Sequence, residues 1–191
     1  MNYNNPTVPT IASPVLLDKA IKEIQTQLST LSWLDKAFAR AYKAVEERDG
    51  KKFYYPEIYV GNGEYLSMMP NDNMDSYCFF DRRDPDYVED DGVNIGAFSL
   101  IRSTVSIVFY WNLERIDSTK TYRYGELLKK DILGILHRGL TLGPIVKVNA
   151  IYEDIEKVFE GYTIDASKTQ LFKHPWQGMR FECTITYREE C

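Results

Sequence analysis

The stretch STVSIVFYWN, residues 103–112, is the most strongly patterned strand in the sequence. Its side chains alternate between two faces, as a β-strand requires. Four large apolar residues share one face: Val105, Ile107, Phe109 and Trp111. The other face carries Val108 and Tyr110 beside smaller polar residues. We therefore predict a long central strand with one face in the core and the other at least partly covered.

The segment before this strand predicts a long amino-terminal helix that begins at Ser13 and ends near Arg48. Serine can cap the free amides of a first turn, and the proline that follows it is preset for the first helical position. Apolar residues then recur at spacings of three and four, with a bend or restart near Thr30: Leu17, Ile21, Ile24, Leu28, Leu31, Leu34, Phe38, Ala41 and Val45. Gly50 follows, and glycine can end a helix in the left-handed conformation.

Between this helix and the central strand the period changes to that of strands. The runs KFYYPEIYV (52–60) and EYLSM (64–68) are joined by GNG, whose residues tolerate positive φ, and this pattern predicts a hairpin. Pro56 has no amide donor, so the first of these strands is expected to lie at an edge or to bulge there. The run SYCFF (76–80) predicts a further short strand.

After the central strand the sequence predicts one helix and two closing strands. The run YGELLKKDILGILHRG (124–139) places Leu128, Ile132, Ile135 and Leu136 at helical spacing, with Gly139 as the stop. The runs PIVKVNAIY (144–152) and MRFECTITY (179–187) alternate as strands do. The fold class expected is α+β: a mostly antiparallel twisted sheet with the long amino-terminal helix and a second helix packed on it. Residues 1–13 are interpreted as a flexible arm and residues 14–191 as a single domain.

The composition of the 191-residue chain is that of a soluble globular protein, with 44% hydrophobic and 27% charged residues. No apolar run is long enough to span a membrane, and the three widely spaced cysteines indicate reduced intracellular thiols. A formal net charge of −5 argues against a DNA-binding module, because affinity for nucleic acid comes mostly from basic side chains. The fourteen tyrosines favour surfaces that become buried on assembly, although any single one is more simply a strand residue.

The segment DRRDPDYVEDDG, residues 81–92, raises the question of a metal or catalytic site. Calcium-loop frames that start at Asp84 or at Asn71 lack ligands that such a loop needs. A segment so rich in charge resists the enclosure that would raise the pKa of a catalytic carboxyl group. We interpret it as a solvated loop that leaves a sheet edge. In it, Arg82, Arg83 and Asp84 are candidates for a charge-matched contact with the same loop of a neighbouring copy.

No motif in the sequence indicates catalysis, a cofactor or a metal. His137 lies near the end of a predicted helix, where the helix dipole favours a cation. The sequence leaves a pair of Cys78 with His174 open, but no motif joins a nucleophile and a base to an orienting group. The glycines of GVNIGAF (92–98) are not followed by the lysine and hydroxyl residue of a phosphate-binding loop. We therefore expect a protein that is not an enzyme and that has no catalytic residues, no cofactor and no metal.

The segment DASKTQLFKHPWQG, residues 165–178, is longer than a compact domain needs between two strands. It either packs on its own domain through Phe172 and Trp176 or serves as a contact arm toward another subunit. Phe172, His174 and Trp176 are accordingly candidates for a subunit interface.

Two stretches, LSWLDKAFARAYK (31–43) and KKFYYPEIYVGNGEYLSMMPNDNMDSYCFF (51–80), resemble proteins of phages and prophages of Bacteroidetes, including crAss-like phages. This resemblance extends over residues 20–115. The predicted element order is also similar to the tail-terminator or tail-completion fold of long-tailed phages, with a leading helix, a twisted sheet and a helix on one face. Members of that fold form rings at the head–tail junction and offer no catalytic residues to carry over. The longer leading helix and the acidic loop depart from the pattern.

The resemblance implies a virion protein, made in the host cytoplasm, that forms a homo-oligomeric ring at the phage head–tail neck or tail end. Its partners would be other copies of itself and the adjacent neck or tail proteins, with no membrane involved. Net acidity agrees with a channel that repels phosphates, so that DNA passes through without specific binding. The alternatives are a monomeric or dimeric ligand-binding α+β domain and a hydrolase that uses the acidic loop.

Overall fold

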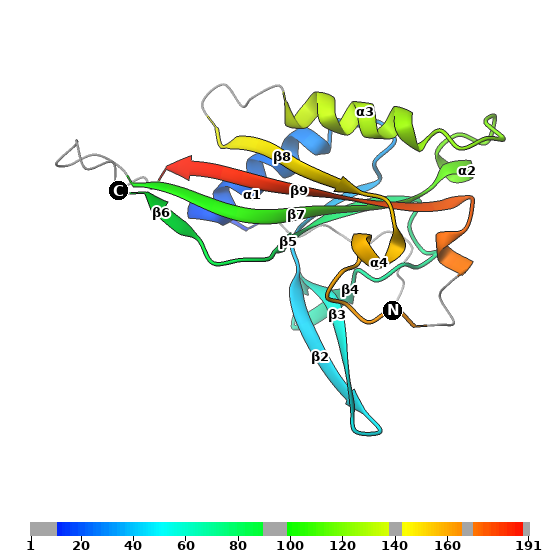
Figure 1. Cartoon of the computed structure of the whole chain (residues 1–191), viewed down its shortest axis with the longest axis horizontal. Coiled ribbons are helices and arrows are strands. Elements are labelled where there is room, and N and C mark those ends of the chain that lie inside the picture. The colour runs from blue at the N-terminus through cyan, green and yellow to red at the C-terminus, as the bar shows by residue number, and fades with distance from the viewer. Residues whose placement is uncertain (1–10, 90–98, 138–142, 166–169, 189–191) are drawn as a thin grey trace.

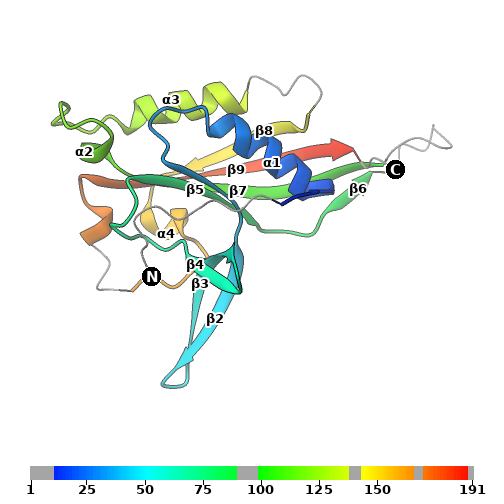
Figure 2. The same ribbon diagram turned by 180° about the vertical axis from the view of Figure 1, so that it is seen from behind.

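The computed structural model describes residues 11–89, 99–137, 143–165 and 170–188. These residues form layers around one large sheet (Figure 1). Two helices, α1 (Leu16–Leu28) and α3 (Gly125–Leu136), lie on the same face of that sheet, as the reverse view also shows (Figure 2). A small second sheet and several connecting segments cover the opposite face.

The large sheet contains β1 (Lys36–Arg40), β5 (Ser76–Arg82), β7 (Leu100–Asn112), β9 (Trp176–Arg188) and β8 (Ile145–Tyr152), in that spatial order. A short strand, β6 (Tyr87–Glu89), pairs with the beginning of β7. β1 runs parallel to β5, whereas the other pairs in this sheet are antiparallel. The prediction of an α+β fold with mostly antiparallel strands is confirmed.

β7 is the long central strand that its sequence predicts. It pairs with β9 along its whole length and with β5 and β6 on its other side. Its first predicted face is fully buried beneath the helices: Val105, Ile107, Phe109 and Trp111. Val108 and Tyr110 are fully buried in a second apolar cluster on the opposite face. Each large apolar side chain contributes about 1.5–3 kcal/mol when it leaves water, so this strand stabilises both layers.

The helices of the described chain bury one apolar stripe each. In α1 these residues are Leu17, Ala20, Ile21, Ile24 and Leu28, and in α3 they are Leu128, Ile132 and Leu136. Two short helices, α2 (Leu113–Ile116) and α4 (Ile155–Val158), complete the set. The helix predicted within 124–139 is confirmed, with His137 at its C-cap. The expectation that Ser13 caps the first helix is wrong, because Val15 holds the N-cap position of α1 without a side-chain hydrogen bond.

The prediction of a long amino-terminal helix is also wrong. α1 ends at Leu28 after thirteen residues, and residues 36–48 form β1 and the strand β2 (Tyr42–Arg48). Of the apolar residues that prolong the helical spacing, Leu34 is buried in the first cluster just before β1 and Phe38 is buried in the second cluster from within β1, whereas Val45 on β2 is 57% exposed. β1 is stabilised by backbone pairing with β5, and a pairing so distant in sequence leaves no mark on the local period.

The small sheet contains β2, β3 (Lys51–Gly61) and β4 (Glu64–Ser67), with β3 in the middle. Asp49 and Gly50 have φ values of 51° and 71°, so Gly50 closes the β2–β3 hairpin and does not end a helix. The predicted hairpin is confirmed as β3 and β4, whose turn passes through Asn62 at positive φ.

Pro56 lies in the middle strand of the small sheet and not at its edge. β4 pairs with β3 only from Glu57 onward, so Pro56 faces the end of β4. Its carbonyl accepts a hydrogen bond from the Met68 amide at 2.7 Å, and the strand has no need of a donor at this position.

β2 and β3 extend past β4 and leave the body of the molecule as a two-stranded arm (Figure 1). We define the arm as residues 44–53. Every residue of the arm is exposed or half-exposed. The arm therefore contributes little to the core.

The closing strands are confirmed as β8 and β9. β9 begins at Trp176, three residues before the predicted start, and buries the predicted alternating set: Met179, Phe181, Cys183, Ile185 and Tyr187. Part of the predicted amino-terminal arm (1–10), the stop at Gly139 and the end of the acidic segment lie outside the described residues. Within the ranges that the structure describes, no helix is long and apolar enough to cross a membrane.

Candidate interaction surfaces

Asp81, the first residue of the acidic segment, is the buried end of β5 and not part of a solvated loop. Asp81 is 7% exposed. Arg83 Nε lies 2.9 Å from Asp81 Oδ2 and forms an ion pair with it. The N–H of Arg83 Nε does not point at this oxygen, so the pair is not a hydrogen bond. The Tyr162 hydroxyl donates a hydrogen bond to the same carboxylate. Burial raises the pKa of Asp81, and the neighbouring charges and this hydrogen bond offset that rise only in part.

Arg82 and Asp84 also have partners within their own chain. Arg82 Nη2 lies 3.2 Å from Asp86 Oδ2, and Arg82 Nε donates to the Asp84 carbonyl at 3.1 Å. Asp86 in turn accepts a hydrogen bond from the Ser103 hydroxyl on β7. Both Arg82 and Asp84 are exposed, and their contact with another copy stays a prediction. Such a contact would compete with the pairing inside the loop.

Residues 170–176 pack on their own chain. The ring of Trp176 stacks on Tyr110 with centroids 5.3 Å apart, and the Arg115 guanidinium lies 5.4 Å from the Trp176 centroid. Phe172 meets Tyr110 and Phe159 edge to face, at 6.2 Å and 5.7 Å. Of the two alternatives for this segment, these contacts favour packing on its own domain. Phe172 and Trp176 stay half-buried, so an interface role for their remaining surface is still a prediction.

His174 and Cys78 have opposite environments. His174 is exposed, with Nε2 3.9 Å from Glu114 Oε1, and Cys78 is fully buried beneath the helices. Burial raises the pKa of the Cys78 thiol, which disfavours the thiolate that a nucleophile needs. The geometry therefore offers no support for a Cys–His pair.

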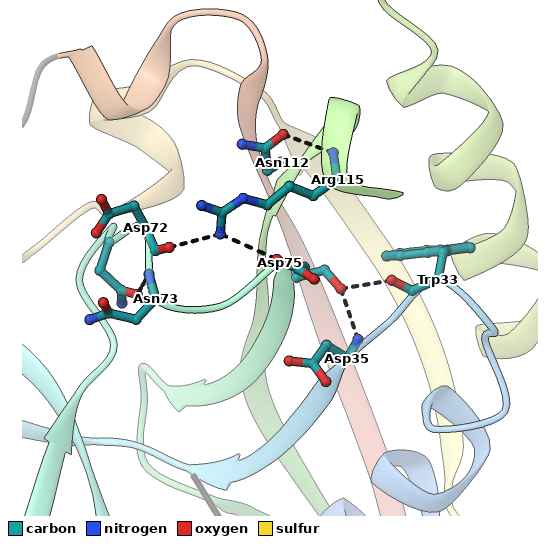
Figure 3. A network of polar contacts seen from close by, with 9 residues as sticks. Trp33, Asp35, Asp72, Asn73, Asp75, Asn112 and Arg115 are labelled. Atoms are coloured by element: carbon teal, nitrogen blue, oxygen red, sulfur yellow. Dashed lines mark hydrogen bonds and ion pairs between the residues drawn. The ribbon is translucent and has the colours of Figure 1, made fainter. Parts of the chain in front are cut away.

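The loop that a calcium frame starting at Asn71 would use is tied down by Arg115 (Figure 3). Arg115 Nη1 donates to the Asp72 carbonyl at 2.8 Å and lies 3.2 Å from Asp75 Oδ1. The next residue, Ser76, donates to the Trp33 carbonyl at 2.7 Å. A guanidinium thus supplies the positive charge at these oxygens. Among the residues described, no group of three or more His, Cys, Asp or Glu side chains is placed to hold a metal ion.

The cavity between the ends of α1 and α3 is small. It is lined by residues that include Ile24, Leu136 and Val146, and it has a volume of about 10 Å³. That is room for about one water molecule, so this cavity is too small for an organic ligand.

The outer face of the small sheet carries three exposed tyrosines that the sequence did not single out. Tyr59 lies opposite Tyr65 with ring centroids 5.4 Å apart, and Tyr42 lies opposite Glu57, which shares the face of Tyr59. Tyr42, Tyr59 and Tyr65 are 55%, 44% and 55% exposed. The other face buries Ile58 and Leu66. We call this set the tyrosine face.

The signal for the tyrosine face is present in the sequence but was hidden by the helix prediction. The dipeptide Asp49–Gly50 between two alternating runs is typical of a two-residue hairpin turn. Pairing outward from that turn places Tyr42 opposite Glu57 and so predicts which tyrosines share a face.

No protein-family model matches this chain, and no curated protein sequence matches it. Its function therefore has to be inferred from its own residues and their geometry.

Proposed function

We propose that this chain is not an enzyme but a structural component of a phage particle. In this proposal it forms a homo-oligomeric ring at the head–tail neck or tail end and joins neighbouring virion proteins around the DNA channel. The observation that carries the proposal is the small sheet, which extends as an arm and exposes three tyrosines on one face. The resemblance to tail-completion proteins supports the same function.

The exposed tyrosines favour a protein partner. Tyrosine buries a large apolar ring while its hydroxyl stays hydrogen-bonded, and it is enriched among residues that dominate binding energy. Tyr42, Tyr59 and Tyr65 come from three adjacent strands, so they form one contiguous surface. We propose that the partner of the tyrosine face is a neighbouring copy of this chain. The arm extends from the same small sheet and leaves the body, so it is suited to reach a different surface on that copy. Such head-to-tail contacts form a ring when the rotation between neighbouring subunits closes.

The charge of the chain fits a channel that conducts DNA. The formal net charge is −5, which disfavours tight binding of phosphates. The duplex would then slide past the ring. A ring whose lumen proved strongly basic would contradict this part of the proposal.

The experiment is a measurement of mass in solution by light scattering, on the purified chain and on variants of the tyrosine face. The wild-type chain should assemble, alone or with adjacent virion proteins. Replacing Tyr42, Tyr59 and Tyr65 with serine should shift it to monomer, because each lost anchor weakens an interface by about 1–2 kcal/mol or more. The matched control is Tyr122→Ser, which removes a tyrosine that is 62% exposed elsewhere on the surface.

Two outcomes would contradict the proposal. A wild-type chain that stays monomeric under every condition and is absent from purified particles would favour the ligand-binding alternative. Assembly that survives in the triple variant but not in Tyr122→Ser would show that the contact surface has been misassigned.

A further inference from the structure

Four consecutive residues, 160–163, connect the root of the arm to β5 and β9 of the large sheet. They follow Val158 and Phe159, which are buried in the second apolar cluster and so fix the start of the segment. Glu160 Oε2 accepts a hydrogen bond from Arg180 Nη1 of β9 at 2.8 Å. The Arg180 side chain is 2% exposed, so this contact ties the segment to the centre of the large sheet.

Gly161 allows the backbone to pass close to two cations. Its φ is +82°, a conformation that favours glycine. A Cβ at this position would lie 3.2 Å from Arg83 Nη1 and 3.8 Å from Lys43 Nζ. Arg83 follows β5, and Lys43 belongs to β2 at the root of the arm, so the two parts meet at this turn.

Tyr162 and Thr163 complete the connection. The Tyr162 hydroxyl donates to the buried Asp81 carboxylate of β5. The Thr163 amide donates to the Tyr54 carbonyl of β3 at 2.9 Å, and the Tyr54 amide donates to Thr163 Oγ1 at 3.0 Å. Thr163 thus satisfies the edge of β3 at a position that β4, which ends at Ser67, does not reach.

We propose that residues 160–163 are a seat that sets the direction in which the arm leaves the large sheet. The seat joins β9, β5 and β3 through polar contacts; it bonds to the arm's root at Tyr54 and passes close to Lys43 at Gly161. Beyond these two residues the arm has no buried side chain to hold its angle. Weakening the seat therefore frees the direction of the arm while the two apolar clusters keep the fold.

The test measures the direction of the arm in the full-length chain with two spin labels. One label is placed at Glu47→Cys on the arm and the other at Lys130→Cys on the exposed side of α3. Cys191→Ser removes the carboxyl-terminal thiol. Cys78 and Cys183 are fully buried, and burial raises the pKa of Cys183 to about 12, so neither is expected to react with the label. Labelled chains are diluted into unlabelled chains so that only distances within one chain are recorded.

The seat variant is Thr163→Val with Tyr162→Phe, which removes two hydroxyl contacts and preserves side-chain shape. The matched control is Thr119→Val with Tyr122→Phe, at exposed positions away from the arm. We expect one narrow distance distribution in the wild type and the control, and a broader or shifted one in the seat variant. Exchange of the Tyr54 amide should accelerate about tenfold in the seat variant, because the amide loses its acceptor on Thr163; a tenfold change corresponds to about 1.4 kcal/mol, which is within the range for one lost hydrogen bond.

A seat variant that keeps the wild-type distance distribution and amide protection would overturn the proposal. Should the double variant fail to fold, as judged by circular dichroism, Thr163→Val alone carries the same prediction for the Tyr54 amide. The use of a fixed arm direction in ring closure rests on the proposed function. The distances, however, are measured within single chains, so a failure of the seat and a failure of the ring are distinguished.

Discussion

Asp81 and Asp84 are three residues apart in one acidic run, yet Asp81 is buried and Asp84 is exposed. The difference comes from position in a strand. Asp81 lies opposite Ser106 in the β5–β7 ladder, whereas the strand has ended before Asp84. The buried carboxylate of Asp81 is paired with Arg83 and Tyr162, and no sequence pattern indicates either pairing. Charge density alone therefore predicts solvation poorly at the end of a strand.

Asp81→Asn should change how stability depends on pH. The pKa of Asp81 is raised by burial, so the folded chain holds this proton more tightly than the unfolded chain. The stability associated with that proton is fully present below about pH 4, the value for an unfolded aspartate, and is lost as pH rises through the folded pKa. Denaturant melts over a pH series should show wild-type stability falling relative to Asp81→Asn in this window.

The control for this measurement is Asp84→Asn, an exposed aspartate whose replacement should change stability by less than about 0.5 kcal/mol. A difference between wild type and Asp81→Asn that grows in favour of the wild type as pH rises would contradict the prediction.

Arg82 and Arg83 should respond differently to charge reversal. Arg83→Glu would place a carboxylate beside buried Asp81 and is expected to destabilise the fold by about 3 kcal/mol or more. Arg82→Glu, at an exposed ion pair, should cost less than about 1 kcal/mol. Arg82→Glu is therefore the sharper probe of the predicted contact between copies. Light scattering should show that Arg82→Glu weakens assembly more at low salt than at high salt, because salt screens the repulsion between exposed charges on neighbouring copies.

Assembly of Arg82→Glu that equals the wild type at every salt concentration would leave the loop with a role in solubility alone. Thermal melts of the same variant check that the fold is intact.

At the scale of elements, residues 31–48 mislead because their apolar residues fit two structures. Leu34, Phe38 and Ala41 are spaced as in a helix, but β1 and β2 are stabilised by partners that follow them in the chain, namely β5 and β3. Intrinsic preference for helix or strand differs by only about 1 kcal/mol per residue, so tertiary pairing decides. The strands β7 and β9 were predicted because their own apolar residues alternate without a break, and one face of each strand is buried.

One type of substitution at two glycines tests the backbone conformations assigned to the β2–β3 turn and to α3. Gly50 has a φ of +71° in the β2–β3 turn, and Gly134 lies in α3, where an added Cβ meets nothing within 4 Å. Gly50→Ala should destabilise the fold by about 1 kcal/mol because alanine resists the left-handed conformation. Gly134→Ala should stabilise it by about 1 kcal/mol because alanine favours a helix. Denaturant melts give both values.

Equal effects of the two alanines would contradict the left-handed conformation assigned to Gly50 in this turn. Gly134→Ala also serves as the positive control for a correctly placed helix.

At the scale of the whole molecule, stability and reach belong to different parts. The two apolar clusters share the strands β5, β7 and β9, and together they stabilise the body. The arm carries exposed or half-exposed residues and lies outside both clusters. A part so separate from the core can serve a contact with another molecule without affecting the fold.

A shortened arm should separate these two properties. Replacing residues 47–52 with Asn-Gly joins Glu46 to Phe53 through a two-residue turn; this opposite pair is of the same hydrogen-bonded type as Arg48 and Lys51, which flank the native turn. The shortened chain should keep its stability to within about 1 kcal/mol, because the deleted residues are not buried. It should lose assembly if the arm is the contact. Melts and light scattering on the same sample give the two answers.

A shortened chain that assembles like the wild type would exclude the tip of the arm as the contact and leave the tyrosine face as the candidate. Loss of folding would instead contradict the separation of arm and body.

The sequence by itself determined the central strand, the strands β5, β8 and β9, the β3–β4 hairpin and the stripe of α3. Each of these elements carries its period within ten or so residues, and that period reflects burial on a face. The sequence also indicated a surplus of tyrosines suited to interfaces. It did not determine which ones are exposed.

Only the tertiary structure decided the fate of residues 31–48, the burial of Asp81 and the grouping of Tyr42, Tyr59 and Tyr65. These depend on partners far away in the chain: β1 on β5, Asp81 on Tyr162, and the root of the arm on Thr163. Such contacts form because the two apolar clusters bring the segments together, and the free energy of that packing exceeds the small local preferences that a sequence pattern records.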